Sequence, residues 1–223
     1  MPRNAGPTMT IWIKICGMTT PDAIEACLAA GVDAIGFVFA ESVRRVTPGE
    51  AADMVATAGA RGRVLCTAVT RHPTQQVVDE ILDVFKPDLL QTDADDLRTL
   101  RLPPQLPLLP VIRRYSVEDS QLPPRLLFEG PTSGSGQTSD WAAARHLARK
   151  SQLILAGGLN ATNVGAAIAA VDPFGVDVSS GVEARPGIKS QAEIARFVSA
   201  ARAACSSGQV PGERAKPAQK EIS

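Results

Sequence analysis

A cysteine at the end of the first apolar segment makes this chain a candidate for acid–base chemistry. The run from Ile11 to Ile15 is typical of a strand, Cys16 follows it, and a helical pattern opens at Pro21. A strand that ends in a thiol delivers it to the strand–helix loop, where α/β proteins keep their chemistry. Strand alternation puts Lys14 on the face of Cys16, roughly 7 Å away. A cation at that place would stabilise a thiolate.

The other interpretation of Cys16 stays open, because a lone cysteine in an apolar setting is usually a small core residue. We interpret Cys27 and Cys66 as core residues and Cys205 as a residue of the tail. No two cysteines form a CxxC pair, and neither of the two histidines has a ligand-like neighbour in sequence. We therefore expect no disulfide framework and no zinc site.

Carboxylates and an amide also stand at or near the ends of apolar segments. Glu129 ends the run that begins at Arg125, Asp177 lies near the end of Gly175–Val178, and Gln91 closes another run. Each side chain could merely cap a helix or pair with an arginine. If their strands share one sheet, however, Glu129 and Cys16 meet at one end of it and make an acid–base pair for a small substrate.

Arg44 follows the second apolar segment, in Ser42-Val43-Arg44-Arg45. A guanidinium at that place is suited to grip a carboxylate with two hydrogen bonds. A solvated loop arginine is the alternative, and it fits Arg45 better.

Three loops rich in small residues suggest a phosphate site. Gly157-Gly158 follows the seventh expected strand, Ser179-Ser180-Gly181 the eighth, and Gly134-Ser135-Gly136 the sixth. Glycines let backbone N–H groups approach an anion, and a following helix N-terminus favours negative charge. Glycine also makes ordinary tight turns, and the third loop could be filler. The first two loops together indicate a phosphate monoester as ligand.

Strand-like and helix-like segments alternate along the whole chain. The expected strands are Ile11–Ile15, Ala34–Phe39, Val64–Val69, Asp88–Gln91, Leu106–Ile112, Arg125–Glu129, Leu153–Ala156 and Gly175–Val178. The expected helices are Pro21–Ala30, Pro48–Ala58, Thr74–Phe85, Asp95–Leu100, a short one near Val117, Trp141–Lys150, Ala161–Val171 and Gln191–Ala204. In 223 residues this pattern predicts an α/β fold, a single-domain (β/α)8 TIM barrel. A doubly wound open sheet is disfavoured because no GxGxxG follows the first strand.

Composition limits the partners of the protein. Acidic and basic residues balance at 23 each without a basic block, which argues against nucleic acid and an anionic membrane. A signal-peptide core and an apolar run of about 20 residues are both missing, so we expect a cytoplasmic protein. Its expected partner is a phosphorylated small molecule, and it is expected to be a monomer or a homodimer. Residues 1–10 and 205–223 are interpreted as disordered extensions of a barrel over 11–204, with Met9 as an alternative start.

Five motifs in chain order resemble those of phosphoribosylanthranilate isomerase. They are Lys14-Ile15-Cys16-Gly17-Met18-Thr19, Gly36-Phe37-Val38-Phe39 with Ser42-Val43-Arg44, Ser139-Asp140-Trp141, Leu155-Ala156-Gly157-Gly158-Leu159, and Gly175-Val176-Asp177-Val178-Ser179-Ser180-Gly181-Val182-Glu183. The resemblance implies an isomerase of tryptophan biosynthesis that needs no metal or cofactor. Its reaction is the Amadori rearrangement of N-(5-phosphoribosyl)anthranilate to 1-(2-carboxyphenylamino)-1-deoxyribulose 5-phosphate.

The same resemblance implies roles for single residues. Cys16 matches the general base, Arg44 the residue near the anthranilate, and Asp177 a polar residue of that pocket. The three small-residue loops match the phosphate-binding face. Glu129 stands where the family usually has aspartate as general acid, and its extra methylene adds about 1 Å, a displacement that can cost about 100-fold in rate. We expect Glu129 to be the acid.

A second departure follows the fourth strand, where the family's Gln-Leu-His-Gly is replaced by Gln91-Thr92-Asp93-Ala94. We keep Gln91 as a substrate-binding residue. The missing histidine affects a polar contact of the pocket and leaves the acid–base pair in place.

Two functions are alternatives to phosphoribosylanthranilate isomerase. The aminoimidazole carboxamide isomerase of histidine biosynthesis works with two aspartates, one at the end of strand one, and Cys16 at that place argues against it. A non-catalytic paralogue that binds a phosphosugar on the same barrel is motivated by the two departures. Intact Cys16, Arg44 and phosphate loops argue against that alternative, and turnover discriminates.

Overall fold

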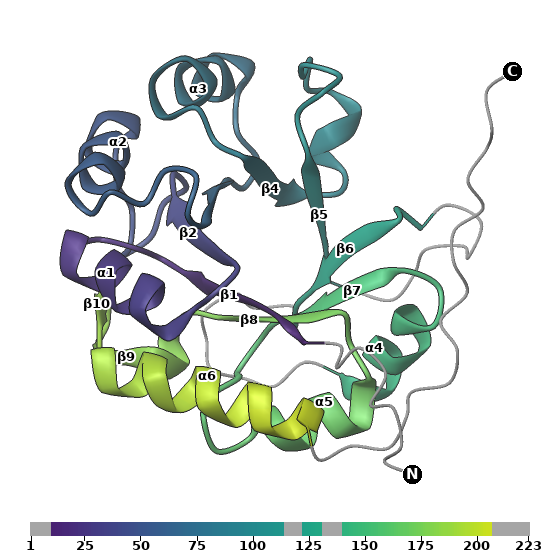
Figure 1. Cartoon of the computed structure of the whole chain (residues 1–223). Coiled ribbons are helices and arrows are strands. Elements are labelled where there is room, and N and C mark those ends of the chain that lie inside the picture. Colours follow the sequence, from purple (N-terminus) through teal and green to yellow (C-terminus); the bar gives the residue numbers. More distant parts are fainter. Residues whose placement is uncertain (1–9, 114–121, 131–139, 207–223) are drawn as a thin grey trace, which may run out of the picture.

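The structure, a computed structural model, describes residues 10–113, 122–130 and 140–206. Eight parallel strands close into a barrel in sequence order, and β1 pairs with both β2 and β8. The strands are β1 (Trp12–Cys16), β2 (Ala34–Val38), β3 (Leu65–Val69), β4 (Leu89–Asp93), β5 (Leu108–Ile112), β6 (Arg125–Phe128), β7 (Gln152–Leu155) and β8 (Gly175–Val178). Figure 1 shows them around a common centre, which confirms the predicted (β/α)8 barrel.

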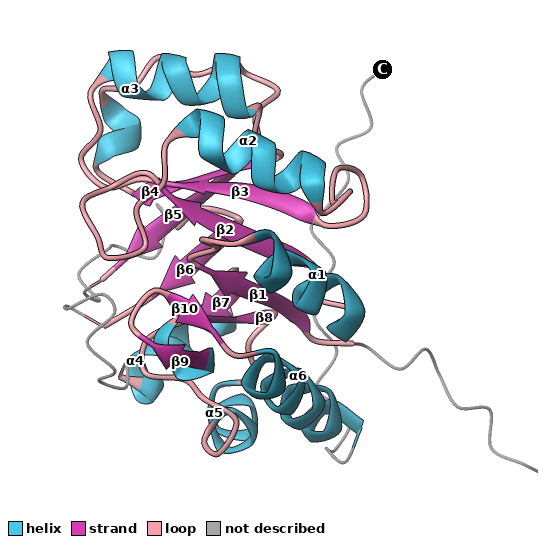
Figure 2. Cartoon of the chain, turned by 90° about the vertical axis from the view of Figure 1, so that its left-hand side faces the viewer, coloured by secondary structure: helices cyan, strands magenta, loops and turns pink. Residues whose placement is uncertain are grey.

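Helices cover the outside of the barrel (Figure 2). They are α1 (Pro21–Ala30), α2 (Pro48–Thr57), α3 (Gln75–Glu80) with the π-helix η1 (Ile81–Phe85), α4 (Trp141–Ala148), α5 (Val164–Val171) and α6 (Gln191–Ser206). Two 3₁₀ turns, η2 (Asp96–Arg98) and η4 (Ser180–Val182), lie in the segments after β4 and β8. A short hairpin, β9 (Glu183–Arg185) with β10 (Ile188–Lys189), follows β8. No helix among the described residues is long and apolar enough to cross a membrane.

Threonines at helix starts show how the sequence sets the element boundaries. Thr20 and Thr47 accept hydrogen bonds from the backbone N–H of the third residue of α1 and α2, and each is followed by proline. Thr47 and Glu50 complete a capping box. These groups satisfy amides that have no partner inside the helix, and proline supplies the helical φ at a position that needs no donor.

The barrel has two apolar layers because strand residues alternate between its two faces. The larger layer lies between strands and helices and includes Ile13, Ile15 and Phe37. The smaller layer fills the barrel from inside and consists of Leu89, Leu109, Val111, Leu127, Ile154 and Ala156, with Trp12 and Phe174 packed against it. The inward positions nearer the strand carboxyl ends are polar, and they make the site described below.

Several elements differ from their predicted form. The second half of the helix expected over Thr74–Phe85 is the π-helix η1, and Arg61 donates hydrogen bonds to the carbonyls of Phe85 and Lys86 at its end. The helix expected over Asp95–Leu100 is the single turn η2. The hairpin β9–β10 was not predicted because its strands are too short for an alternating pattern. The helix near Val117 and most of the two predicted terminal extensions fall outside the described residues.

Candidate active site

Cys16 and Lys14 point into the barrel from β1, as strand alternation predicts. Cys16 is 7% exposed and Lys14 is fully buried. Gly36 on β2 is the register partner of Cys16. A Cβ added to Gly36 would lie 3.0 Å from Cys16 Sγ and 3.1 Å from Lys14 Nζ, so both atoms rest against this glycine. The site needs glycine at position 36 because any side chain there would displace the thiol and the ammonium.

Lys14 is paired across the barrel seam. Its Nζ donates a hydrogen bond of 2.8 Å to Asp177 Oδ1, and the two residues are register partners on β1 and β8. Burial by itself would lower the pKa of Lys14, but the charges of Asp177 and Cys16 outweigh it and raise that pKa. Lys14 therefore stays a cation beside the thiol.

The Cys16 thiol has a raised pKa. Burial is the main cause, Lys14 and Lys189 act against it, and Asp177 and Glu129 add to it. In the ligand-free protein the sulfur therefore holds its proton at neutral pH. Cys16 is the last residue of β1 and Glu129 directly follows β6, so both predicted members of the acid–base pair stand at the carboxyl ends of the parallel barrel strands.

Arg44 lies against Gly17, where an added Cβ would come within 2.6 Å of Arg44 Cδ. Its Nε and Nη2 donate to the two carboxylate oxygens of Glu183 at 2.6 and 2.8 Å. The predicted two-pronged grip is thus made on a carboxylate of the protein itself. The hydrogen bond to Glu183 is the main reason that the pKa of Arg44 is raised.

Lys189 of β10 is a second buried cation at this end of the barrel. Its Nζ donates to Glu183 Oε1 and to the Ser179 carbonyl, both at 2.9 Å. Burial lowers the pKa of Lys189 in spite of Glu183. Burial alone would raise the pKa of Glu183, but hydrogen bonds from Arg44 and Lys189 lower it. Glu183 therefore stays ionised and ties the hairpin to Arg44.

Glu129 follows β6 directly, and its backbone N–H donates to the carbonyl of Ile112 at 3.1 Å. Arg113, the first residue after β5, donates from Nη1 to Glu129 Oε2 at 2.9 Å. Arg113 also donates from Nε to Asp93 Oδ1 at 2.9 Å. One guanidinium thus joins a residue from each of the two departures described above, Asp93 and Glu129.

Gln91 of β4 points into the barrel and is 6% exposed. Its Oε1 and the hydroxyl of Thr67 on β3 are buried without a hydrogen-bond partner among the described residues. Buried polar atoms are almost always hydrogen-bonded in native proteins. The Gln91 amide oxygen therefore has an unused capacity to accept a hydrogen bond inside the barrel.

The structure brings two of the three predicted phosphate loops together, Gly157-Gly158 and Ser179-Ser180-Gly181. Gly157 and Gly158 both have a left-handed φ, 90° and 64°, which glycine adopts without strain. Gly181 lies so close to the next loop that an added Cβ would be 1.9 Å from the Leu159 carbonyl oxygen. Ser179 and Ser180 precede that contact, and Ser179 borders Gly17 beside the thiol. The third predicted loop, Gly134-Ser135-Gly136, lies outside the described residues.

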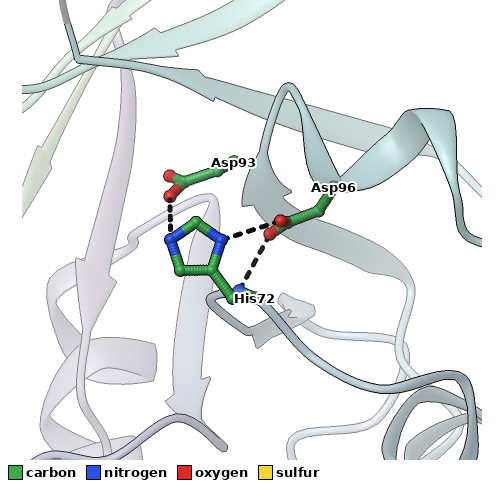
Figure 3. A group of neighbouring side chains, drawn as sticks. All are labelled: His72, Asp93 and Asp96. Carbon is green, nitrogen blue, oxygen red and sulfur yellow. Dashed lines mark hydrogen bonds and ion pairs between the residues drawn. The ribbon is translucent and has the colours of Figure 1, made fainter.

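His72 lies between two carboxylates near the end of β4 (Figure 3). Its Nδ1 is 2.9 Å from Asp96 Oδ1, and its Nε2 is 3.7 Å from Asp93 Oδ2. The three side chains are of types that bind metal ions, and their ligand atoms lie within 4.8 Å of one another. Each ring nitrogen, however, faces a different carboxylate, and the Arg113 guanidinium already binds Asp93. We interpret the group as a hydrogen-bonded and ionic network and assign it no metal.

Sequence reasoning missed three charged residues of this end of the barrel: Arg113, Glu183 and Lys189. A signal existed for Arg113, because it continues the inward positions Leu109 and Val111 by two residues, just as Glu129 continues Leu127. Glu183 and Lys189 lie beyond the last barrel strand. Only the folding back of the β9–β10 hairpin brings them to the site.

A closed (β/α)8 barrel with a thiol, a carboxylate and buried cations at the carboxyl ends of its strands defines the class of barrel enzymes that carry out acid–base chemistry there. Comparison with known proteins narrows the class. The family model described as N-(5'-phosphoribosyl)anthranilate (PRA) isomerase matches residues 13–200. The chain belongs to this family.

Individual relatives agree with the family assignment. N-(5'-phosphoribosyl)anthranilate isomerase of Mesorhizobium japonicum is 35% identical over 88% of this chain and 97% of its own length. The crystal structure of TrpF from Jonesia denitrificans is also 35% identical, with a TM-score of 0.72 over 87% of this chain and 98% of that one. A second solved structure, 26% identical with a TM-score of 0.71, covers 86% of this chain and 99% of that one. It shows a phosphoribosyl anthranilate isomerase in complex with reduced 1-(o-carboxyphenylamino)-1-deoxyribulose 5-phosphate.

Proposed function

We propose that this protein converts N-(5-phosphoribosyl)anthranilate to 1-(2-carboxyphenylamino)-1-deoxyribulose 5-phosphate in tryptophan biosynthesis, with Cys16 as general base and Glu129 as general acid. One observation carries the assignment of these two residues: Cys16, buried beside Lys14, ends β1, and Glu129 directly follows β6, so both stand at the carboxyl ends of the strands of one barrel. An acid and a base that border one space can act on two atoms of one small substrate.

The reaction begins at the furanose ring. Glu129 gives its proton to the ring oxygen, the C1–O bond breaks, and the nitrogen lone pair forms a C1=N double bond. The thiolate of Cys16 then removes the proton from C2, and the electrons of that bond return through C1 to the nitrogen as an enolamine. C1 finally gains a proton and the C2 hydroxyl loses one, which gives the ketone. Substrate and product are isomers, so no oxidant or reductant is consumed.

The order of these steps fits the charges of the site. The raised pKa of Cys16 keeps the thiol protonated when the site is empty. A protonated Schiff base places positive charge next to the sulfur, which favours the thiolate. We infer that the thiol then releases its proton, which the Glu129 carboxylate, left ionised by the first step, takes up, so that the base is generated when the intermediate that needs it is present. General acids and bases in such positions contribute about 10²–10⁴-fold each.

The remaining predicted residues bind the substrate in this proposal. The phosphate is held by amides and hydroxyls of the loops at Gly157-Gly158 and Ser179-Ser180-Gly181, together with Gly134-Ser135-Gly136. Gln91 and Asp177 are buried at inward positions of β4 and β8, and the Gln91 amide oxygen has no hydrogen-bond partner among the described residues. Arg44 lies at the rim beside Gly17, with Nε and Nη2 committed to Glu183. We propose that it meets the anthranilate carboxylate with the rest of its guanidinium.

We also propose a cellular location and an oligomeric state. The protein is proposed to act in the cytoplasm, as a monomer or a homodimer. The molar mass from light scattering on protein eluted from a size-exclusion column decides between monomer and homodimer.

Proton NMR on the reaction mixture tests the proposed function. Freshly generated phosphoribosylanthranilate has a proton on its anomeric carbon, whereas the product has a C1 methylene next to a ketone. Addition of the protein should remove the anomeric signal and produce the methylene signal far faster than in buffer. A binding protein without activity would leave only the slow breakdown of the free substrate.

A further inference from the structure

Arg113 lies between two carboxylates at the carboxyl ends of the barrel strands. It is the first residue after β5, and its carboxylate partners come from the neighbouring strands, Asp93 at the end of β4 and Glu129 just after β6. We propose that Arg113 is a positioning residue, which orients the carboxyl group of Glu129 toward the substrate. This inference rests on the proposed function, because it assigns a task to a residue that acts through the general acid.

Different nitrogen atoms of the guanidinium bind the two carboxylates. Nε and Nη2 both lie 2.9 Å from a single oxygen of Asp93, Oδ1. The remaining nitrogen, Nη1, donates to Glu129 Oε2 at 2.9 Å. Because the guanidinium is rigid and planar, Asp93 sets its plane and thereby sets the direction of the bond to Glu129. The side chains of all three residues are at most 18% exposed, so little water competes for these bonds.

Glutamate needs such support more than aspartate does. It has one more rotatable bond, so its carboxyl group can reach more positions, and only some of them point at the ring oxygen of the substrate. A catalytic group that is misplaced by about 1 Å can cost about 10²-fold in rate. The hydrogen bond from Arg113 Nη1 holds one carboxyl oxygen of Glu129 and so limits the wider range of the longer side chain.

Asp93 shares the guanidinium with Glu129 and is itself held at the end of β4. Arg113 is bound to a carboxylate of each neighbouring strand, so its position depends on the barrel and not on Glu129 alone.

A double-mutant cycle in kcat tests the proposal. Arg113→Ala is made alone and together with Glu129→Gln, and single-turnover rates are measured with excess protein. We expect Arg113→Ala alone to lower kcat about 10- to 100-fold with little change in KM. We expect the same substitution to cost at most about 2-fold when Glu129 is already glutamine, because residues that act through one another are not additive.

A matched control is Arg71→Ala. Arg71 Nε lies 3.8 Å from the same Asp93 carboxylate, but its side chain is half exposed. This variant should keep the kcat of the unmodified protein. A thermal unfolding curve accompanies every variant, and Arg113→Lys replaces Arg113→Ala in the cycle if the alanine variant does not fold. Lysine keeps the charge without the planar fork, so a loss of kcat is still expected.

Two results overturn the positioning role. One is an Arg113 variant with unchanged kcat. The other is the same fold loss in both backgrounds, which would mean that Arg113 acts independently of Glu129. In either case the unmodified protein turns over its substrate and the proposed function stands. A folded unmodified protein without any turnover removes the proposed function and this inference together.

Discussion

The ammonium of Lys14 and the carboxylate of Asp177 lie 2.8 Å apart inside the barrel, on the first and the last strand. The pair therefore bridges the seam at which the sheet closes on itself. It also stands next to Cys16, since Lys14 and the thiol rest against the same glycine. Barrel closure and the electrostatics of the proposed base thus depend on the same two side chains.

Removal of Lys14 should destabilise the protein. Lys14→Met leaves the Asp177 carboxylate buried without its cation, and loss of one partner of a buried pair costs about 3–5 kcal/mol. We expect a drop of this order in the free energy of unfolding, measured by urea denaturation. Asp177→Leu in the same chain removes the orphaned charge and should recover much of the loss. Equal stabilities of Lys14→Met and the unmodified protein would show that the pair does not hold the seam.

Lys189 should set the pH at which Cys16 becomes reactive. Its positive charge lowers the pKa of the thiol, so Lys189→Met should raise that pKa further. The thiolate fraction at a given pH then falls, and the rise of the Cys16 alkylation rate moves to higher pH. Iodoacetamide labelling followed by mass spectrometry of the Cys16 peptide measures this alkylation rate as a function of pH. Lys150→Met is the control, because Lys150 is exposed and precedes β7, at the opposite end of the barrel. A shift to lower pH would contradict the electrostatic account.

Gly36 should tolerate no side chain. Gly36→Ala would put a Cβ 3.0 Å from the Cys16 sulfur and 3.1 Å from Lys14 Nζ, so the thiol must move. We expect a loss of kcat of about 10-fold or more, since small displacements of catalytic groups are costly. Gly165→Ala is the matched control: this helical position of α5 has room, with the Ala204 Cβ at 3.9 Å as the nearest atom. That variant should keep full activity and gain up to about 1 kcal/mol in stability. Equal activities of both variants would exclude the packing role of Gly36.

Substitutions of Glu129 distinguish the need for an acidic proton from the need for a side chain of this length. Glu129→Gln keeps the shape but has no proton to give, so the variant should be nearly inactive. Glu129→Asp keeps the acid with a shorter side chain and should retain substantial activity, since aspartate is the usual residue of the family. Steady-state kcat values of the three proteins decide the matter. Were all three equal, Glu129 would not be the acid.

The fold was predictable from the chain because its strands and helices carry strong local signals. The predicted α1 and β8 have the observed bounds, and the Thr-Pro starts of α1 and α2 are real caps. Local signals were weaker where tertiary contacts decide. The π-helix η1 ends where Arg61, a residue outside the helix, binds its last carbonyl groups. The β9–β10 hairpin is too short to have a periodicity of its own.

The candidate site was predictable where single positions on strands decide it. Cys16, Gln91 and Asp177 lie inside the barrel because strand alternation leaves them no other place. The ion pairs that join distant parts of the chain at the site were not predictable. Lys14 meets Asp177 across 163 positions of sequence, and Arg44 meets Glu183 across 139. No local pattern encodes such pairs, since only closure of the barrel brings them together.

The most direct test of the account is the decay of anthranilate fluorescence after addition of freshly generated phosphoribosylanthranilate. Three proteins are compared: the unmodified chain, Cys16→Ala, and Cys27→Ala, which changes a second buried cysteine on helix α1, outside the strands of the barrel. The account predicts rapid decay with the unmodified protein and with Cys27→Ala, and a loss of kcat of at least about 100-fold with Cys16→Ala. Near-normal turnover by Cys16→Ala would contradict the role of the thiol, and no decay with the unmodified protein would contradict the isomerase itself.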